Sequence, residues 1–429
     1  MRHLLFLTVI PLLLLTCRTA REASPRAYAQ DTETITDGEV TYFRFRPDSV
    51  QRPDTFVWER LTQQDRAYYL PDPDHPEYLP ERRVRLNFHV MNSADSIFPM
   101  QGEVAVKYAQ DVLNYTNAFM RDNPENWLNP DSITPPALPT HIKYVLATDP
   151  ETQAPAVYEH FDDEHYGYIH KGPGMNRSDM EVVKKYNVRP DEELNIYWMG
   201  PPKEKIVNMG AKKTSGSGIY LGTALKVTDV LSKDVAPWSI RQVFSHELGH
   251  ALGLYHAWTR NDGCPDTPVH ANKAWSAKKR GPNLTSNNLM DYSPDQEALT
   301  PCQIARMHIK LADKTTRQRG WLEPVWCDYE PDAPIIIAED LVLNGARDYA
   351  SDLIVQPGAT LTINNRVHLP EGGSIRVAAG GRLILGPDAI LHNDCGGTWR
   401  GIFIAEATSI EGLATVETHS SATLLNVAP

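Results

Sequence analysis

The sequence predicts a multidomain protein in which an α/β (α+β) domain at residues 84–325 precedes an all-β, parallel β-helix-like region at residues 326–429. Three observations predict this division. The chain of 429 residues is long enough for more than one domain with its own core. From Val84 onward, strand-like and helix-like patterns alternate, which is typical of an α/β or α+β domain. After Trp326, strand-forming residues dominate and helix signals nearly disappear.

Residues 1–29 are predicted to be a signal peptide. A short basic start precedes an apolar run at residues 4–15, which is as long as a signal-peptide core and too short to span a bilayer. Two cleavage sites stay open: the run ends in Leu-Leu-Thr-Cys, which resembles a bacterial lipobox ending at Cys17, and residues 27–29 suit ordinary signal peptidase. Either site predicts export, as a bacterial cell-surface or outer-membrane lipoprotein attached by lipid on Cys17, or as a secreted protein.

Residues 30–83 are predicted to be a propeptide or an N-terminal linker. The segment is polar, weakly periodic and rich in Pro and Asp. As a linker it would be a plain spacer. As a propeptide it would lie in a cleft of the following domain, and Arg82 and Arg83, just before the first predicted strand, would be the site of activating cleavage.

The predicted elements of the first domain alternate along the chain. Val84 opens a strand, VRLNFHV, because apolar and polar residues alternate there. Further elements are predicted in this order: a helix at 103–120, strands at 141–147, 193–200 and 216–222, a helix that carries the stretch HELGHALGLYH, and a closing helix at 303–313.

The last hundred residues repeat with a step of eight. Val367, Ile375, Leu383 and Leu391 follow one another at this spacing, with Gly-rich turns between them. Short strands joined by tight turns at a fixed step are typical of a stacked solenoid. Three steps make a coil of about 24 residues, which suits a right-handed parallel β-helix. A small β-sandwich with regular hairpins is the alternative.

The stretch HELGHALGLYH at residues 246–256 predicts a metal site. His246 and His250 are four residues apart, so both project from one face of a helix. Gly253 permits the turn that ends the helix and returns His256 to the same ion. Three neutral imidazoles with one open position are the arrangement of catalytic zinc. Glu247, beside them, is suited to accept a proton from an activated water molecule as general base.

The motifs together resemble a known family. HExxHxxGxxH is the signature of the metzincin metalloproteases, which also carry a methionine turn, here NLMDY at residues 288–292. The stretches LGLYHAW, DTP, NLMDY and LTPCQIARMH are similar to the pappalysin family over about residues 237–310. The resemblance implies a metzincin-like fold for the first domain. It also implies a zinc-dependent endopeptidase that hydrolyses peptide bonds of proteins through zinc-activated water, with Glu247 as general base.

The resemblance also implies roles for single residues. Met290 would be a hydrophobic floor under the histidines, and Tyr292 a catalytic residue that stabilises the tetrahedral oxyanion. The strand Gly216–Gly222 would be the rim on which an extended peptide adds antiparallel. Asp266 and Thr267 match a region that binds calcium in relatives, and Asp262 offers a further hard oxygen, so Ca²⁺ is a second candidate cofactor besides Zn²⁺.

Asp295 and Glu297 follow the methionine turn and are candidate specificity residues. A carboxylate in the wall of the pocket after the scissile bond would favour Arg or Lys there. As plain solvated loop charges they would have no such role.

Five cysteines constrain the covalent structure. If Cys17 is lipidated or removed, four remain, and four allow three pairings. Export makes disulfides plausible. Cys264 with Cys302 is the preferred pair because both flank the predicted active site, and Cys327 with Cys395 would follow.

The net charge restricts the kinds of partner that the sequence predicts. The formal net charge of −12 argues against a nucleic-acid partner, since phosphate binding needs a basic surface. Protein or peptide substrates are expected, and the sequence gives no oligomeric state. A second interpretation is a surface adhesin or scaffold whose β-helix binds a ligand and whose protease domain is inactive. The intact Glu247, Tyr292 and three histidines count against it.

Overall fold

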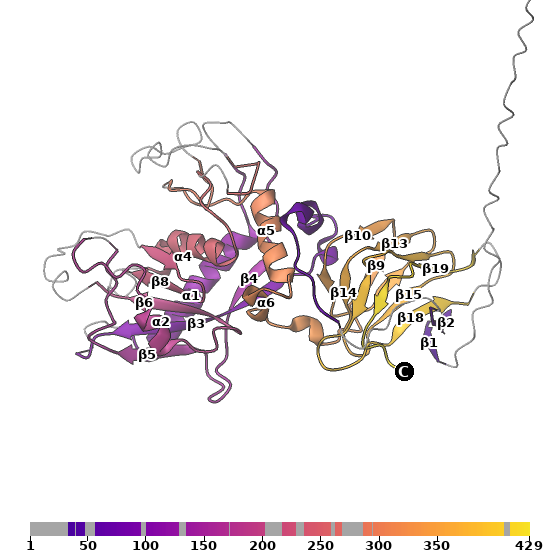
Figure 1. The fold of residues 1–429 in the computed structure, drawn as a ribbon, viewed down its shortest axis with the longest axis horizontal. Coiled ribbons are helices and arrows are strands. Elements are labelled where there is room, and N and C mark those ends of the chain that lie inside the picture. Colours follow the sequence, from indigo (N-terminus) through magenta and orange to yellow (C-terminus); the bar gives the residue numbers. More distant parts are fainter. Residues whose placement is uncertain are drawn as a thin grey trace, which may run out of the picture.

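The computed structural model places two domains side by side, with an N-terminal segment running along both (Figure 1). The structure describes residues 33–38, 40–47, 56–95, 100–127, 134–170, 172–201, 217–228, 236–258, 262–267, 286–293, 295–406 and 412–429. The predicted signal peptide lies outside these residues. No helix among them is long and apolar enough to cross a membrane.

The first domain is built on a mainly parallel sheet with the strand order β4-β3-β6-β8-β7, and β5 pairs with the far half of β3. Among the described strands of this sheet, only β7 runs antiparallel, beside β8, and it lies at the end of the strand order. The strands are β3 (Arg82–Asn92), β4 (Ile142–Leu146), β5 (Val157–Phe161), β6 (Leu194–Met199), β7 (Gly218–Tyr220) and β8 (Ala224–Thr228). The central β3 is almost continuously buried, as parallel strands covered on both faces are.

Helices complete the core of this domain. They are α1 (Gly102–Arg121), α2 (Glu181–Tyr186), α4 (Pro237–Ala251), α5 (Pro301–Ala312) and α6 (Arg317–Gly320). The long helix α1 packs against α4, and its buried side chains recur at helical spacing. Helix α5 begins with a capping box, in which Thr300 and Gln303 satisfy each other's backbone N–H groups. The predicted alternation of strands and helices is therefore present.

The second domain consists of three parallel sheets whose strands alternate along the chain. The first sheet holds β9 (Ile335–Ile337), β12 (Leu353–Val355), β15 (Ser374–Val377) and β18 (Gly401–Ala405). The second holds β10 (Leu341–Leu343), β13 (Thr360–Ile363), β16 (Arg382–Leu385) and β19 (Thr415–Thr418). The third holds β11 (Arg347–Asp348), β14 (Arg366–His368), β17 (Ile390–His392) and β20 (Thr423–Leu424). A short 3-10 helix, η4 (Val325–Cys327), leads into this domain.

The eight-residue step of the sequence marks successive strands of this domain. Val367, Ile375, Leu383 and Leu391 lie on β14, β15, β16 and β17, and all four are fully buried. Each strand pairs in parallel with the strand three places later, so equivalent aliphatic side chains stack. The hairpins of the alternative sandwich would need antiparallel pairs, and the described residues 335–424 contain none among themselves.

The described residues of the N-terminal segment lie along the second domain and α5, and none of them lines the cavity around His246, His250 and His256. The segment's strands β1 (Thr34–Asp37) and β2 (Val40–Phe45) form a hairpin, and β2 pairs antiparallel with β18 at the edge of the second domain. Two 3-10 helices, η1 (Gln63–Tyr69) and η2 (Pro76–Tyr78), then run between the domains. The hydrophobic side chains of the segment's described residues bury against β18 and α5, and its role as a propeptide stays a prediction.

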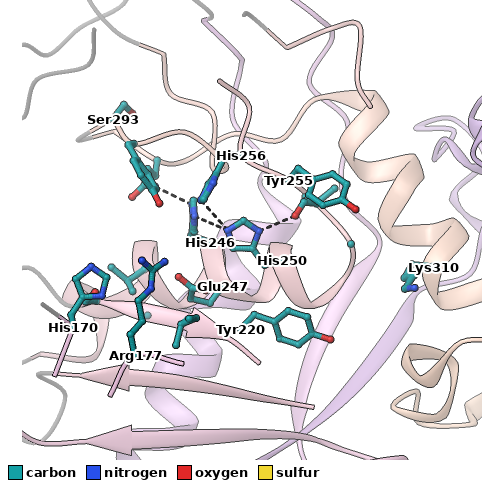
Figure 2. A pocket seen from close by; sticks show the side chains of 18 of the residues that line it. His170, Arg177, Tyr220, His246, Glu247, His250, Tyr255, His256, Ser293 and Lys310 are labelled. Carbon is teal, nitrogen blue, oxygen red and sulfur yellow. Dashed lines mark hydrogen bonds between the residues drawn. The ribbon is translucent and has the colours of Figure 1, made fainter. Parts of the chain in front are cut away.

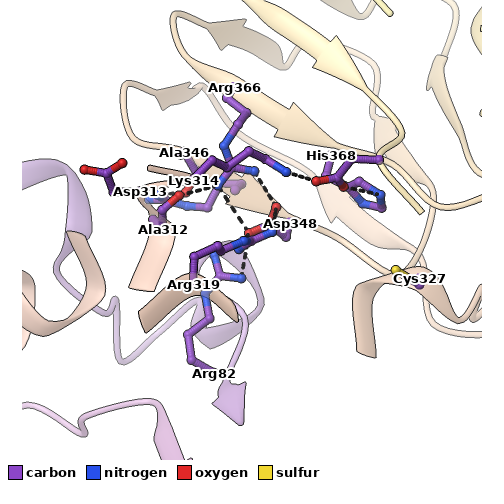
Figure 3. A network of polar contacts seen from close by, with 12 residues as sticks. Arg82, Ala312, Asp313, Lys314, Arg319, Cys327, Ala346, Asp348, Arg366 and His368 are labelled. Atoms are coloured by element: carbon purple, nitrogen blue, oxygen red, sulfur yellow. Dashed lines mark hydrogen bonds and ion pairs between the residues drawn. The ribbon is translucent and has the colours of Figure 1, made fainter. Parts of the chain in front are cut away.

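The domains meet at a buried cluster of charges around Asp348 (Figure 3). Arg82 of β3 and Arg319 of α6 each donate to Asp348 at 2.7 Å, and Arg366 of β14 donates to it as well. Arg82 is 2% exposed. Arg82 is therefore buried in this structure, whereas the Arg83 side chain is 42% exposed, and cleavage at this pair stays a prediction.

Candidate active site

The end of helix α4 positions the three histidines. A Schellman motif closes the helix: the Gly253 N–H bonds to the His250 carbonyl at 3.1 Å, and the Leu254 N–H to the Gly249 carbonyl at 2.9 Å. Gly253 has φ +90°, a conformation that favours glycine. The chain therefore reverses and brings His256 back beside the helix, as the spacing predicted.

The three imidazoles converge on one point. Nε2 of His250 lies 3.1 Å from Nε2 of His246 and 3.1 Å from Nε2 of His256. Nδ1 of His246 donates to the Leu289 carbonyl at 2.7 Å, and Nδ1 of His250 donates to the Leu254 carbonyl at 2.8 Å. Both Nε2 atoms therefore carry lone pairs, and these lone pairs repel each other unless a cation lies between them.

This donor set fits zinc. Three nitrogens at tetrahedral positions around zinc are about 3.3 Å apart, close to the separations in this site. Burial and the neighbouring His250 lower the pKa of His246 to about 3, and burial lowers the pKa of His256 to about 4. The rings are therefore neutral at physiological pH, the form that binds a metal.

Glu247 lies under the rim strand. Gly218 of β7 is so close that a Cβ atom there would lie 2.4 Å from Cγ of Glu247. Burial raises the pKa of Glu247 to about 7, while the Tyr220 N–H and the charge of Arg177 oppose that rise. A carboxyl group whose pKa is near neutrality can both accept and return a proton.

The methionine turn forms the floor. Met290 is fully buried and its sulfur fills the space that a side chain at Gly249 would take, at 2.5 Å from a Cβ there. The turn is held by Asn288, whose amide exchanges two hydrogen bonds with Gln303 of α5 at 2.8 and 3.0 Å. Tyr292, about half exposed, lies with its ring 4.7 Å from the His256 ring.

The three histidines, Glu247, Tyr292 and the rim strand line one cavity of about 800 Å³ (Figure 2). Besides the predicted residues, the lining includes side chains that the sequence interpretation missed, namely His170, Arg177, Val243, Tyr255, Ser293, Gln296, Lys310 and Gln318. His170 and Arg177 come from a loop about 70 residues before the motif, and no local pattern connects them with it.

Comparison with known proteins is consistent with this geometry. Residues 208–312 match a peptidase family model, Peptidase_M43, described as pregnancy-associated plasma protein-A. This segment therefore matches the model of the pappalysin family. The resemblance predicted over residues 237–310 lies inside the match and is confirmed.

Two curated relatives, both called "Extracellular metalloprotease", match about a third of the chain. The protein of Verticillium alfalfae is 28% identical over 157 residues, which cover 32% of this chain and 55% of the relative. That of Colletotrichum graminicola is 25% identical over 158 residues, covering 33% and 57%. The chain thus spans about half the length of these relatives. A solved structure, "Mirolysin in complex with compound 9", aligns at 16% identity and TM-score 0.38, covering 56% of this chain and 96% of that one.

The predicted calcium residues of the pappalysin segment have other partners. Asp262 accepts bonds from the Cys264 N–H at 2.9 Å and from the Thr267 hydroxyl. Asp266 accepts from the Thr300 hydroxyl at 2.8 Å and from the Cys302 N–H at 3.0 Å, which ties it to the start of α5. These oxygens would have to exchange hydrogen bonds for a cation, so calcium stays a prediction.

Neither predicted specificity residue is among the residues that line the cavity. Glu297 forms an ion pair with Arg241 at 3.3 Å. Asp295 follows a turn in which its N–H donates to the Ser293 hydroxyl at 3.2 Å. Gln296, between them, does line the cavity.

Both expected disulfides are present. Cys264 pairs with Cys302, and Cys327 with Cys395. The first bond links the segment after the third histidine to helix α5. The second links the connection between the domains to the second domain.

Proposed function

We propose that the chain is an exported zinc-dependent endopeptidase that hydrolyses peptide bonds of proteins. The observation that carries this proposal is the convergence of three Nε2 atoms beside Glu247, under an edge strand. The pappalysin-family match and the relatives named as extracellular metalloproteases support the reaction and the export.

His246, His250 and His256 would hold the metal, and zinc bound there supplies Lewis-acid activation of a water molecule and of the scissile carbonyl. The Nδ1 bonds to backbone carbonyls fix the orientation of His246 and His250 and leave Nε2 free for the ion.

Strand β7, Glu247 and Tyr292 would bind the substrate, transfer protons and stabilise the transition state. An extended peptide would add to the free edge of β7, antiparallel, through backbone hydrogen bonds. Glu247 would take the proton of the attacking water and pass it to the leaving amine. The Tyr292 hydroxyl would donate to the oxygen that becomes negative in the transition state, for which its position beside His256 is suited.

The decisive experiment compares casein digestion by the wild-type protein and by Glu247→Ala, each with measured zinc content. We expect wild-type hydrolysis that stops on chelation and returns with zinc. Glu247→Ala should bind zinc equally well and hydrolyse nothing. Hydrolysis by zinc-loaded Glu247→Ala, or none by the zinc-loaded wild type, would reject the proposal.

We further propose that residues 326–429 form a parallel β-helix that binds or positions a partner, supported by the three parallel sheets. The adhesin or scaffold interpretation needs an inactive first domain, and the complete set of histidines with Glu247 counts against it. The casein digest separates the two.

Lipid on Cys17, removal of residues 30–83 and bound calcium are further proposals that the mature protein can test. Mass spectrometry of that protein would give its N-terminus and any lipid. Metal analysis of the same sample would give zinc and calcium.

A further inference from the structure

A second cavity lies beside the junction of the two domains. Its volume is about 750 Å³, and it is lined by residues 56–62, 65 and 68 of the N-terminal segment, by the end of α5 and by turns of the second domain. Among the described residues, none lines both this cavity and that of the histidines. Concave sites of this size are where proteins bind small molecules and short oligomers.

One wall of this cavity is a ladder of amides in the turns that follow the second sheet of the β-helix-like domain. Asn344 follows β10 and Asn364 follows β13, and the two strands pair in register. Nδ2 of Asn364 donates to Oδ1 of Asn344 at 2.9 Å. The next strand, β16, is followed by Gly386, where a Cβ atom would collide with Oδ1 of Asn364. The Asn344 amide nitrogen donates to no residue that the structure describes, so it is available to a ligand.

The N-terminal segment supplies aromatic side chains to the cavity. Trp58 is held in place by the Lys314 ammonium group, 4.7 Å from its ring centroid, and by the His392 ring at 4.8 Å. Phe56 packs edge-on against Trp58 at 4.9 Å. Tyr68 lines the same cavity and is 43% exposed. An exposed aromatic ring in a cavity wall can cover an apolar face of a ligand.

The charges of the lining balance one another. The described lining residues include as many cations as carboxylates, namely Arg60, Lys314 and Arg366 against Glu59, Asp65 and Asp388. Lys314 forms an ion pair with Asp394, and Arg366 is bound to Asp348 (Figure 3). Because these two cations already have counter-charges, an anionic ligand would gain little from them. The lining therefore favours a ligand that is polar but uncharged.

We propose that this cavity binds an uncharged oligosaccharide. The hydroxyl groups of a sugar both donate and accept hydrogen bonds, which suits amide and carboxylate side chains. The Asn344 amide donates to a hydroxyl oxygen, and the exposed carboxylate of Asp388 accepts from a hydroxyl group. The Tyr68 ring covers an apolar C–H face of the sugar.

The ladder also indicates a chain of sugars and not a single one. Its rungs follow stacked parallel strands, which are about 4.8 Å apart, so polar groups repeat along the wall. The proposal goes beyond peptide hydrolysis and does not depend on the zinc site. It gives the partner-binding role of the second domain a chemical class of ligand.

Isothermal titration calorimetry of the full-length protein tests this proposal. The probes are neutral hexasaccharides of glucose, mannose, xylose and N-acetylglucosamine, with a galacturonate hexamer as the anionic probe. We expect at least one neutral probe to bind and the galacturonate hexamer not to bind. Tyr68→Ala should weaken binding about tenfold, because the sugar loses its ring contact.

Asn344→Asp isolates the free amide donor. The aspartate keeps an oxygen that accepts from Asn364 and removes only the N–H groups, so binding should again weaken about tenfold. Tyr115→Ala is the matched control for Tyr68→Ala. Tyr115 is 45% exposed on α1 and lines neither cavity, so its loss should leave sugar binding unchanged.

The outcomes separate this proposal from the peptidase function. If no neutral probe binds at millimolar concentration, or if the galacturonate hexamer alone binds, the inference is wrong. Binding that is as tight in Tyr68→Ala and Asn344→Asp as in the wild type would place the sugar elsewhere and reject it equally. Both variants should digest casein at the wild-type rate, because neither residue lines the histidine cavity. A wild-type protein that binds a sugar but digests no casein would reject the peptidase function alone.

Discussion

Gly218→Ala should inactivate the enzyme while leaving it folded. The Cβ atom of the new alanine would lie 2.4 Å from Cγ of Glu247 and 2.9 Å from its Cδ and Oε1. Ordinary contacts begin at 3.4 Å, so the glutamate or the strand has to move by roughly 1 Å. Because Glu247 is held between β7 and the histidine cluster, that displacement falls on the group proposed as the base.

The size of the effect follows from this displacement. A misplacement of about 1 Å at a reacting group costs roughly 100-fold in rate. The histidines themselves are not displaced by a methyl group at the rim, so zinc affinity should stay unchanged. Gly218 has no left-handed backbone conformation, so alanine adds no backbone strain there. We therefore expect kcat to fall about 100-fold at constant zinc content and with Tm nearly unchanged.

Gly222→Ala, in the turn after β7, is the matched control. A Cβ atom there meets nothing within 4 Å, but φ is +83°. This variant should lose about 1 kcal/mol of stability and keep its kcat, the reverse of the first variant. Peptide kinetics, zinc analysis and thermal unfolding measure all three quantities. If Gly218→Ala kept kcat within threefold of the wild type, the close approach of β7 to Glu247 would have no functional meaning.

Three further changes test other parts of the site. Gly249→Ala would place a Cβ atom 2.5 Å from the Met290 sulfur, and this overpacking should lower the free energy of unfolding by about 1–3 kcal/mol. Urea titration measures this change, and an unchanged midpoint would contradict the close packing of Met290 on the helix. Replacing Cys264 and Cys302 with serine opens a loop with a sequence separation of 38 residues and should cost about 4 kcal/mol, measured as a lower Tm than that of the wild type without reductant. Tyr292→Phe should lower kcat about 100-fold or more with KM unchanged, and a kcat near that of the wild type would remove its role as oxyanion donor.

The centre of the site could be predicted from the sequence because its residues are close together along the chain. Two histidines on one helix face, a glycine that ends the helix and a third histidine lie within eleven residues, so helix geometry alone brings them together. The eight-residue step also predicted the second domain, because each strand there pairs in parallel with the strand three places later.

The residues that surround this centre could not be predicted from the sequence. Arg177 reaches the cavity because Lys226, 49 positions later, holds its loop, and no periodicity records such a contact. The segment 30–83 looked like a propeptide because it is polar and rich in proline. Its few apolar residues find partners on β18 and α5, which the sequence alone could not match to them.

Helix α5 connects the floor of the site with the interface between the domains. Its first turn carries Gln303, which holds the methionine turn, and at its other end the Ala312 carbonyl accepts a bond from Arg366 at 2.9 Å. Arg366 is itself bound to Asp348, so loosening the interface should loosen one end of α5.

Asp348→Asn should therefore affect zinc as well as stability. Three buried guanidinium groups would lose their counter-charge, which costs about 3–5 kcal/mol. Although burial opposes it, these groups hold the pKa of Asp348 well below its ordinary range. The wild-type contribution is therefore present above the unfolded pKa of about 3.9 and is lost only as the pH falls below that value. We expect the variant to unfold at lower temperature at pH 7 and to release zinc to a chelator faster, whereas Gly218→Ala releases it at the wild-type rate. A lower Tm with unchanged zinc release would show that α5 does not transmit the change.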